Sequence, residues 1–235
     1  MTVNEIMADL QAHGNEGIKN ILIKHGVKEP FFGVKVEHLK TIQKKIKKDY
    51  QLAKDLYVTG NADAQYLAGL IADDAKMTKA DLQTWAKGAL SDNISGNTVP
   101  WVAAEGNYGY ELALEWIESP EEYIAVAGWA TLGSLASLKP DSELDMDSLK
   151  SLLNRVEKTI HSSPNRVRGT MNNFIISVGA YVASLTDYAI TVANNIGPVT
   201  VIKEGTACKT PAAVEYIEKA KARGSLEKKK KTVKC

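Results

Sequence analysis

Apolar residues recur at helical spacing along almost the whole chain. The clearest run follows the i, i+3, i+4, i+7, i+11 pattern of one buried helix stripe and consists of Leu149, Leu152, Leu153, Val156 and Ile160. Similar spacing recurs from Val167 to Val182 and, as a narrower stripe, from Val36 to Ile46. Only Val199 to Lys203 suggests a strand. The sequence therefore predicts an all-α fold of roughly ten to twelve helices.

The spacing of these helices favours a repeat architecture. Helices pair along the chain at intervals of about 30 to 45 residues, which predicts an α-α superhelix of stacked HEAT-like helical hairpins. We expect residues 1–223 to form a single domain, followed after Gly224 by a basic tail, residues 224–235. Small residues fill the stretch 125–136, so that helix should allow close neighbours, with Trp129 as its one bulky projection. Asp63 is a candidate cap for a helix starting at Ala64.

Composition excludes several classes of protein. Two cysteines, Cys208 and Cys235, give no disulfide framework and no zinc-ligand spacing, so we predict a reducing, cytoplasmic setting without a metal. The N-terminal residues lack the uninterrupted apolar core of a signal peptide, and no apolar run is long enough for a membrane span. We expect a monomer that uses no small-molecule cofactor and binds no membrane.

Charge is distributed unevenly, although the net charge is only +1. Residues 88–138 hold seven acidic residues, three of the four tryptophans and no lysine, arginine or histidine. Residues 217–235 hold eight basic and two acidic residues. Such asymmetry concerns the partners of a protein more than its fold.

Two basic segments are candidates for phosphate contact. Lys40, Lys44 and Lys48 are i, i+4, i+8 neighbours on the predicted helix from Val36, and they form either a solvated face or a stripe that binds nucleic-acid phosphates. The tail contains four consecutive lysines, Lys228, Lys229, Lys230 and Lys231. It is either a disordered solubilising end or a phosphate-binding arm.

The tryptophans divide into core and candidate ligand contacts. Trp85 and Trp116 are assigned to the core, where most large aromatic side chains lie. Trp101 precedes Glu105 by one helical turn. A ring beside a carboxylate could stack on a base and stabilise a developing positive charge.

Several short motifs in order resemble the DNA alkylation repair family of HEAT-like repeat proteins. They are Pro-Phe-Phe-Gly-Val-Lys at 30–35 with the basic helix after it, Trp-Ile-Glu-Ser at 116–119, Gly-Trp-Ala at 128–130, and the Cys208 region with the lysine tail. The resemblance runs from about residue 15 to the end and is carried by the order of individually weak motifs. It implies a superhelix that holds duplex DNA on a basic concave face. In active members it implies an alkylpurine glycosylase that does not flip its base.

The resemblance fails at the catalytic positions. The family's Trp-Asp-x-Val-Asp-x-x-Ala run falls on residues 96–103, which places Pro100 where the catalytic aspartate stands. The family's later arginine falls near Ala127, and residues 88–138 contain no arginine at all. Its second tryptophan falls near Asn172 or Asn173. A shift of one turn would instead pair Trp101 with Glu105 at the family's Trp-to-Asp spacing.

Three functions follow from these observations. The first is a DNA-binding protein without the standard glycosylase residues, which binds double-stranded, damaged or branched DNA with a log-log salt slope of roughly −4 to −7. Its phosphate contacts are Lys40, Lys44, Lys48, Arg166, Arg168 and the tail, and its concave middle is lined by Trp101, Trp129, Asn172 and Asn173. The second is an active glycosylase that excises cationic alkylated bases with Glu105 as its catalytic carboxylate. The third is a protein-binding scaffold that uses the acidic segment 105–122.

Overall fold

The structure, a computed structural model, describes residues 1–202, 209–226 and 228–234. These residues form thirteen α-helices, and no strand occurs among them. The all-α prediction is confirmed. The predicted strand does not form over the described residues 199–202, whereas Lys203, Cys208 and Cys235 lie outside the described residues. The helices are α1 (Val3–Ala12), α2 (Glu16–Lys24), α3 (Val36–Ile46), α4 (Tyr50–Tyr57), α5 (Ala62–Ile71), α6 (Lys79–Gly88), α7 (Val99–Glu105), α8 (Gly109–Trp116), α9 (Glu122–Leu138), α10 (Met146–Thr159), α11 (Asn165–Tyr181), α12 (Thr186–Ile196) and α13 (Ala213–Ala222).

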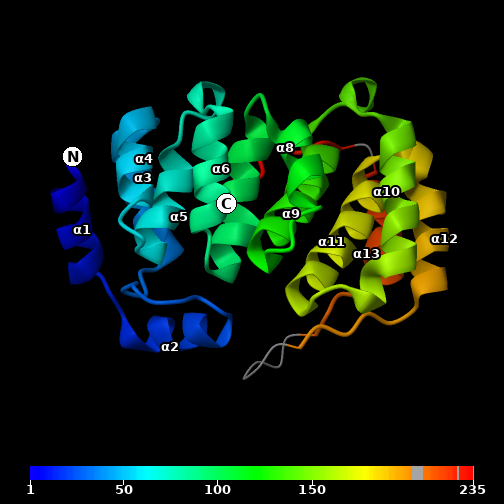
Figure 1. Cartoon of the computed structure of the whole chain (residues 1–235), viewed down its shortest axis with the longest axis horizontal. Helices are drawn as coiled ribbons and strands as arrows, with labels where there is room; N and C mark the ends of the chain where they lie inside the picture. Colours follow the sequence, from blue (N-terminus) through cyan, green and yellow to red (C-terminus); the bar gives the residue numbers. More distant parts are fainter. Residues whose placement is uncertain (203–208, 227, 235) are drawn as a thin grey trace.

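From α4 onward the helices form stacked antiparallel pairs, as predicted. Helices α5, α7, α9, α11 and α13 pack in order and form an inner layer, and each is preceded by its outer partner, α4, α6, α8, α10 or α12. Figure 1 shows the helices standing side by side along the long axis, with α1 at one end and α12 at the other. Helix α2 lies across one edge of this row.

Polar contacts between successive outer helices reveal the repeat that the sequence shows only weakly. The Tyr50 hydroxyl donates to Asp81, 31 residues away, at 2.7 Å. Gln83 Nε2 donates to Glu115, 32 residues away, at 2.8 Å. The Tyr110 hydroxyl donates to Ser148, 38 residues away, at 2.7 Å. Each contact joins neighbouring hairpins at similar heights, so the structural period is 31 to 38 residues.

All four tryptophans are buried in the core. Trp85 and Trp116 are 2% and 1% exposed, as predicted. Trp101 and Trp129 are 5% and 1% exposed, which corrects the prediction that they line an open concave surface. The Trp101 ring meets Tyr66 edge-on, and the Trp129 ring packs against Phe174 with centroids 5.4 Å apart. Because the residues next to Trp129 in α9 are small, its ring fills the space towards α11 instead of facing solvent.

The small-sided helix α9 approaches its neighbours closely, as predicted. A Cβ at Gly128 would lie 2.8 Å from the backbone nitrogen of Ile117 and 3.0 Å from the carbonyl oxygen of Ala113. Both atoms belong to the end of α8, so only glycine permits this α8–α9 contact.

Two local predictions are wrong. Helix α3 ends at Ile46 because Lys47 has a φ of 67°, so Lys48 does not continue the helical face of Lys40 and Lys44. Helix α5 is capped by Asn61, whose Oδ1 accepts from the backbone N–H groups of residues 63 and 64. Asp63 instead accepts hydrogen bonds from the backbone N–H groups of residues 32, 33 and 34, and so organises that loop.

Within the described chain, no single helix is long and apolar enough to cross a membrane. Helix α11 and the segment Ala183–Ile196 pass that test only as a pair, by length and composition, with a bend of 116° between them.

Candidate nucleic-acid interface

A cavity of about 800 Å³ lies where the inner helices begin. Its lining comes from the turn before α7, the second turn of α9, the first half of α11, the end of α2, and the segments that flank residues 203–208. We call this side of the inner layer the N-terminal edge. The polar lining residues are Lys24, His25, Asp92, Asn97, Asn165, Arg166, Thr170, Asn173 and Thr210.

The helix ends at this edge favour an anion. Within the described residues, the N-cap residues of α9, α11 and α13 make no side-chain hydrogen bond to their own helices, and Glu122 accepts from one N–H of α11. The free N–H groups and the helix dipole therefore present partial positive charge. Helix α7 is preceded by a π-helical turn, Ile94–Thr98, that brings Gly96 and Asn97 to the cavity.

Arg166 joins the two halves of the molecule beside the cavity. Its guanidinium forms an ion pair with Asp92 and lies over the Tyr123 ring, 5.3 Å from the centroid. Its backbone N–H donates to Glu122 at 2.8 Å, so a carboxylate occupies part of the first turn of α11. Burial lowers the pKa of Arg166. Asp92 compensates part of the positive charge of Arg166. Arg166 therefore links several elements of the fold as well as providing a basic group at the cavity.

The end of α2 is fixed against the Asp92–Arg166 ion pair. Gly26 has a φ of 82°, and a Cβ there would lie 2.5 Å from Asp92 Oδ2 and 2.9 Å from Arg166 Nη1. The Lys28 backbone N–H donates to the Ser91 hydroxyl at 2.9 Å. These contacts hold the exposed residues just before Gly26 at the rim of the cavity.

Of the four polar residues of α11 that were predicted to contact DNA, two line the cavity and two do not. Arg166 and Asn173 belong to the lining. Arg168 lies outside it and donates to the Thr200 carbonyl at 3.2 Å. Asn172 is 2% exposed and donates to the Pro211 carbonyl at 2.9 Å, which corrects the prediction that it lines an open surface. These two side chains are directed at the connection between α12 and α13.

The opposite side of the inner layer, which we call the C-terminal edge, is covered by the end of the chain. Residues 228–234, named here the C-terminal strap, run back from α13 across the ends of α11, α9 and α7 (Figure 1). Lys229 Nζ donates to the Ala136 carbonyl at 2.9 Å and forms an ion pair with Asp141 at 2.8 Å. The Lys230 backbone N–H donates to the Ser137 carbonyl at 2.8 Å. The strap therefore satisfies carbonyls at the end of α9.

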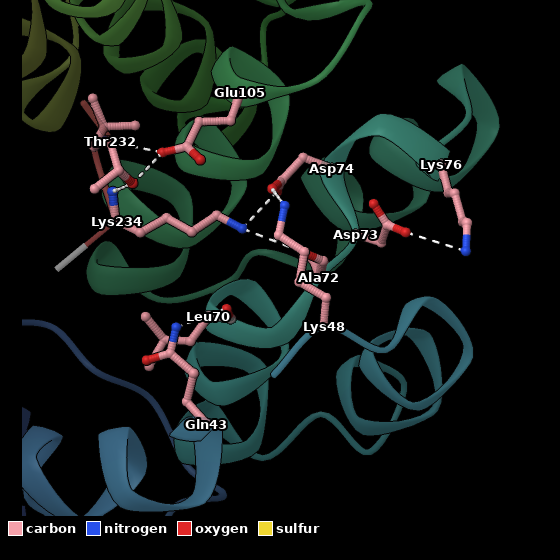
Figure 2. Close-up of polar contacts among 11 residues, drawn as sticks. Gln43, Lys48, Leu70, Ala72, Asp73, Asp74, Lys76, Glu105, Thr232 and Lys234 are labelled. Carbon is pink, nitrogen blue, oxygen red and sulfur yellow. Dashed lines mark hydrogen bonds and ion pairs between the residues drawn. The ribbon is translucent and has the colours of Figure 1, made fainter. Parts of the chain in front are cut away.

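The far end of the strap enters a buried acidic site (Figure 2). Lys234 Nζ lies 2.6 Å from Asp74 Oδ1, and these side chains are 9% and 3% exposed. Asp74 also lies 3.5 Å from Lys48 Nζ. Burial is the largest influence on the Asp74 carboxyl and raises its pKa above the usual range, although Lys234 opposes this. Lys48 therefore belongs to this edge and not to a stripe with Lys40 and Lys44.

Comparisons with known proteins agree with this architecture. The model of the DNA alkylation repair enzyme family matches residues 6–216. The chain belongs to this family. Two uncharacterized proteins, from Listeria innocua and Listeria monocytogenes, are each 31% identical over 229 residues, which cover 95% of this chain and 99% of theirs. A solved structure matches with a TM-score of 0.92 and 36% identity over 100% of both chains. It represents a new family of proteins related to the HEAT-like repeat DNA glycosylases, with affinity for branched DNA structures.

No carboxylate stands at the position where the resemblance places the family's catalytic aspartate. Pro100, which the resemblance places there, is buried in the first turn of α7. Glu105, the alternative carboxylate, ends α7 at the opposite edge, where it accepts from the Thr232 hydroxyl and, at 2.9 Å, from the Val233 backbone N–H (Figure 2). The Trp101 ring is buried, so this pair does not form a site open to a nucleotide.

Six of the seven acidic residues of 88–138 are engaged by other parts of the chain. Besides Asp92, Glu105 and Glu122, three of them join successive outer helices. Glu111 pairs with Lys79 at 2.5 Å, Glu115 accepts from Gln83, and Glu118 pairs with Arg155. Hydrogen bonds from Arg155 are the largest influence on Glu118 and lower its pKa. The acidic segment thus serves contacts between hairpins.

One group in the described chain has the residue types of a metal site, which the sequence analysis did not expect. Asp9, His13 and His38 offer ligand atoms within 4.8 Å of one another. The two imidazole rings, however, stack face to face with centroids 3.7 Å apart, and His38 Nε2 lies 2.8 Å from Asp9 Oδ2. Imidazoles bound to one ion radiate from it through their ring nitrogens. We therefore assign this group as a hydrogen-bonded contact between α1 and α3.

Sequence reasoning missed several cavity residues. Lys24 and His25 belong to no basic cluster in the sequence, and their importance comes from their place at one helix end. Asn97 and Asn165 were missed because their importance comes from the converging helix ends. The signal that the sequence offers is the position of each next to a predicted helix boundary.

Proposed function

We propose that this protein binds branched DNA through its N-terminal edge. The observation that carries the proposal is the convergence of uncapped inner helices, Lys24 and Arg166 on one open cavity of about 800 Å³. Helix N-termini and basic side chains together bind phosphate groups. The cavity is smaller than a duplex, so it suits the backbone of one strand while the arms lie on the surrounding surface.

The structural neighbour supports branched DNA as the ligand, because it has affinity for branched DNA structures and matches this chain over its whole length with 36% identity. Other cations are available for further arms. Lys40 and Lys44 make no ion pair with any described residue, and we propose them as contacts for a second arm. The lysines of the strap are proposed to serve mainly the fold, since Lys229 and Lys234 already bind the chain's own acceptors.

We propose binding without glycosylase activity. N-glycosidic cleavage builds positive charge on the sugar, which a neighbouring carboxylate stabilises. The proposal is supported by the burial of Pro100 and by the engagement of Glu105 with the strap. We also propose that the protein acts as a monomer in the cytoplasm, without a cofactor.

A titration by fluorescence anisotropy tests the binding proposal. A four-way junction, a fork, a linear duplex and a single strand, all built from the same sequences, are titrated over a series of salt concentrations. We expect the tightest binding to the junction and fork, with a log-log salt slope of roughly −4 to −7. Equal affinity for all four ligands, or an affinity insensitive to salt, would contradict the proposal.

A base-release assay tests the catalytic part separately. Duplex DNA containing 7-methylguanine is incubated with the wild-type protein and with Glu105→Gln. We expect both to release base at the spontaneous rate. Release by the wild type that disappears in a folded Glu105→Gln variant would show that the protein is a glycosylase and that Glu105 is its catalytic carboxylate.

A further inference from the structure

Two exposed isoleucines, Ile23 and Ile202, line the cavity beside its polar groups, and Ile23 is the one that belongs to a helix. Ile23, in the last turn of α2, lines the cavity and is 48% exposed. It directly precedes Lys24 and His25, which also belong to the lining. A large aliphatic side chain gains free energy when it leaves water, so an exposed one at a binding site favours an apolar ligand surface.

Ile23 is held in this position by contacts behind it. Helix α2 buries none of its own residues in the described structure, so packing alone would leave its orientation weakly fixed. The tie between Gly26 and the Asp92–Arg166 pair, together with the hydrogen bond from Lys28 to Ser91, fixes the helix end. The side chain is thus presented at the cavity by a rigid support.

Branched DNA offers the apolar surface that a linear duplex lacks. Where arms diverge, base pairs lose a stacking neighbour and expose a flat face. Aliphatic side chains insert at unstacked or kinked base steps in other DNA-binding proteins. Lys24 lines the same cavity as Ile23 and is available to bind a phosphate of that DNA.

We propose that Ile23 packs against the exposed base faces at a DNA branch point and thereby confers preference for branched over linear DNA. This inference rests on the proposed function. Lys24 and the helix N-termini contribute affinity common to all DNA, whereas Ile23 contributes only where a base face is open.

The test compares two isoleucines of the same helix. Ile23→Ser is compared with Ile21→Ser, because Ile21 is 52% exposed on α2 and lies outside the described cavity lining. Affinities for a four-way junction and a linear duplex are measured by anisotropy, after thermal unfolding confirms that both variants are folded. We expect Ile23→Ser to weaken junction binding by about tenfold, the value for burying much of one isoleucine, and to leave duplex binding within about twofold. Ile21→Ser should change neither affinity.

A second readout reports on the bases. A 2-aminopurine placed at the branch point should change its fluorescence when the wild type or Ile23→Leu binds, and less when Ile23→Ser binds. A wild type that prefers junctions together with an Ile23→Ser variant that keeps this preference would overturn the inference and leave the proposed function intact. Loss of junction and duplex binding in equal measure would also overturn it. A wild type that binds no DNA would overturn the proposed function itself.

Discussion

The two edges of the inner helix layer are built from the same helices. They differ in which groups form hydrogen bonds with the backbone at the helix ends. At the C-terminal edge, carbonyls and carboxylates accept from the chain's own strap, as in the contacts of Lys229 with Ala136 and Lys234 with Asp74. At the N-terminal edge, uncapped helices surround an open cavity. A helix end needs a partner of the opposite polarity. The strap provides one for the carbonyl ends. At the N–H ends Glu122 accepts from one N–H of α11, and the N–H groups that have no partner remain for an anionic ligand.

This difference changes the meaning of the basic tail. Eight basic residues in 217–235 predict a phosphate-binding arm when only the sequence is considered. In the structure, two lysines of the strap form ion pairs with buried or half-buried carboxylates at the C-terminal edge, away from the cavity. The number of basic residues in a segment is therefore a weaker guide to the ligand site than the helix end that they contact. Lysines at C-terminal helix ends bind the chain's own carbonyls and carboxylates.

The largest expected effect on stability comes from removing a strap contact at the C-terminal edge. Lys234→Met leaves the buried Asp74 without its nearest cation, and removal of one partner of a buried pair costs about 3–5 kcal/mol. We expect the unfolding free energy to fall by that amount in urea titrations at pH 7.5. Lys231→Met is the matched control, because Lys231 is exposed and pairs with no described acidic residue. Junction affinity of the folded variant should match that of the wild type.

The same variant has a defined pH dependence. The folded-state pKa of Asp74 already lies above its usual value, and loss of Lys234 raises it further. A raised carboxyl pKa means that the folded state disfavours the ionised form, so the loss of stability is complete above the folded pKa. It should shrink as the pH falls towards about 4, the unfolded pKa. A deficit that stays constant between pH 7.5 and 4.5 would mean that lost packing, and not the unpaired charge, is responsible.

The second effect concerns the contacts that fix the end of α2 at the N-terminal edge. Gly26→Ala requires alanine at a φ of 82° and places its Cβ against Asp92 and Arg166, so we expect a loss of about 1–3 kcal/mol in unfolding free energy. Gly60→Ala is the control, because Gly60 has a φ of 69° but no described atom within 4 Å of its built Cβ. Only Gly26→Ala should also weaken junction binding in anisotropy titrations, since it displaces the rim that carries Lys24. Equal junction affinity in the two variants would show that the rim does not contact DNA.

Much of the fold could be predicted from the sequence, because helical periodicity is a local property. The stripes at 149–160 and 167–182 correspond to α10 with its following turn and to α11. The small-residue helix α9 also packs closely, as its composition indicates. The errors lie where a distant residue decides the outcome. Asp63 has the chemistry of a cap, but the loop at 32–34 uses its carboxylate while Asn61 caps the helix.

The candidate site was predicted only in part, because it depends on which helix ends meet. Asn173 was proposed from the family resemblance and Arg166 as a phosphate contact, and both line the cavity. Trp101, Trp129 and Asn172 have suitable chemistry for DNA contact, yet burial removes them from its surface. Lys24 stands alone in the sequence and gains its significance from α11, more than a hundred residues away. The spacing of residues along the sequence does not predict that two such distant segments meet.

The smallest expected effect compares one lysine from each edge. Lys24→Gln removes one cation from the cavity rim, so it should lower the magnitude of the log-log salt slope by about 1 and weaken junction and duplex binding alike. Lys231→Gln removes an exposed cation from the strap and should leave the slope unchanged. Both residues are exposed lysines, so the pair separates position from net charge. If Lys231→Gln lowered the slope as much as Lys24→Gln, the DNA would reach both edges of the inner layer, and the strap would have to be counted as part of the interface as well as of the fold.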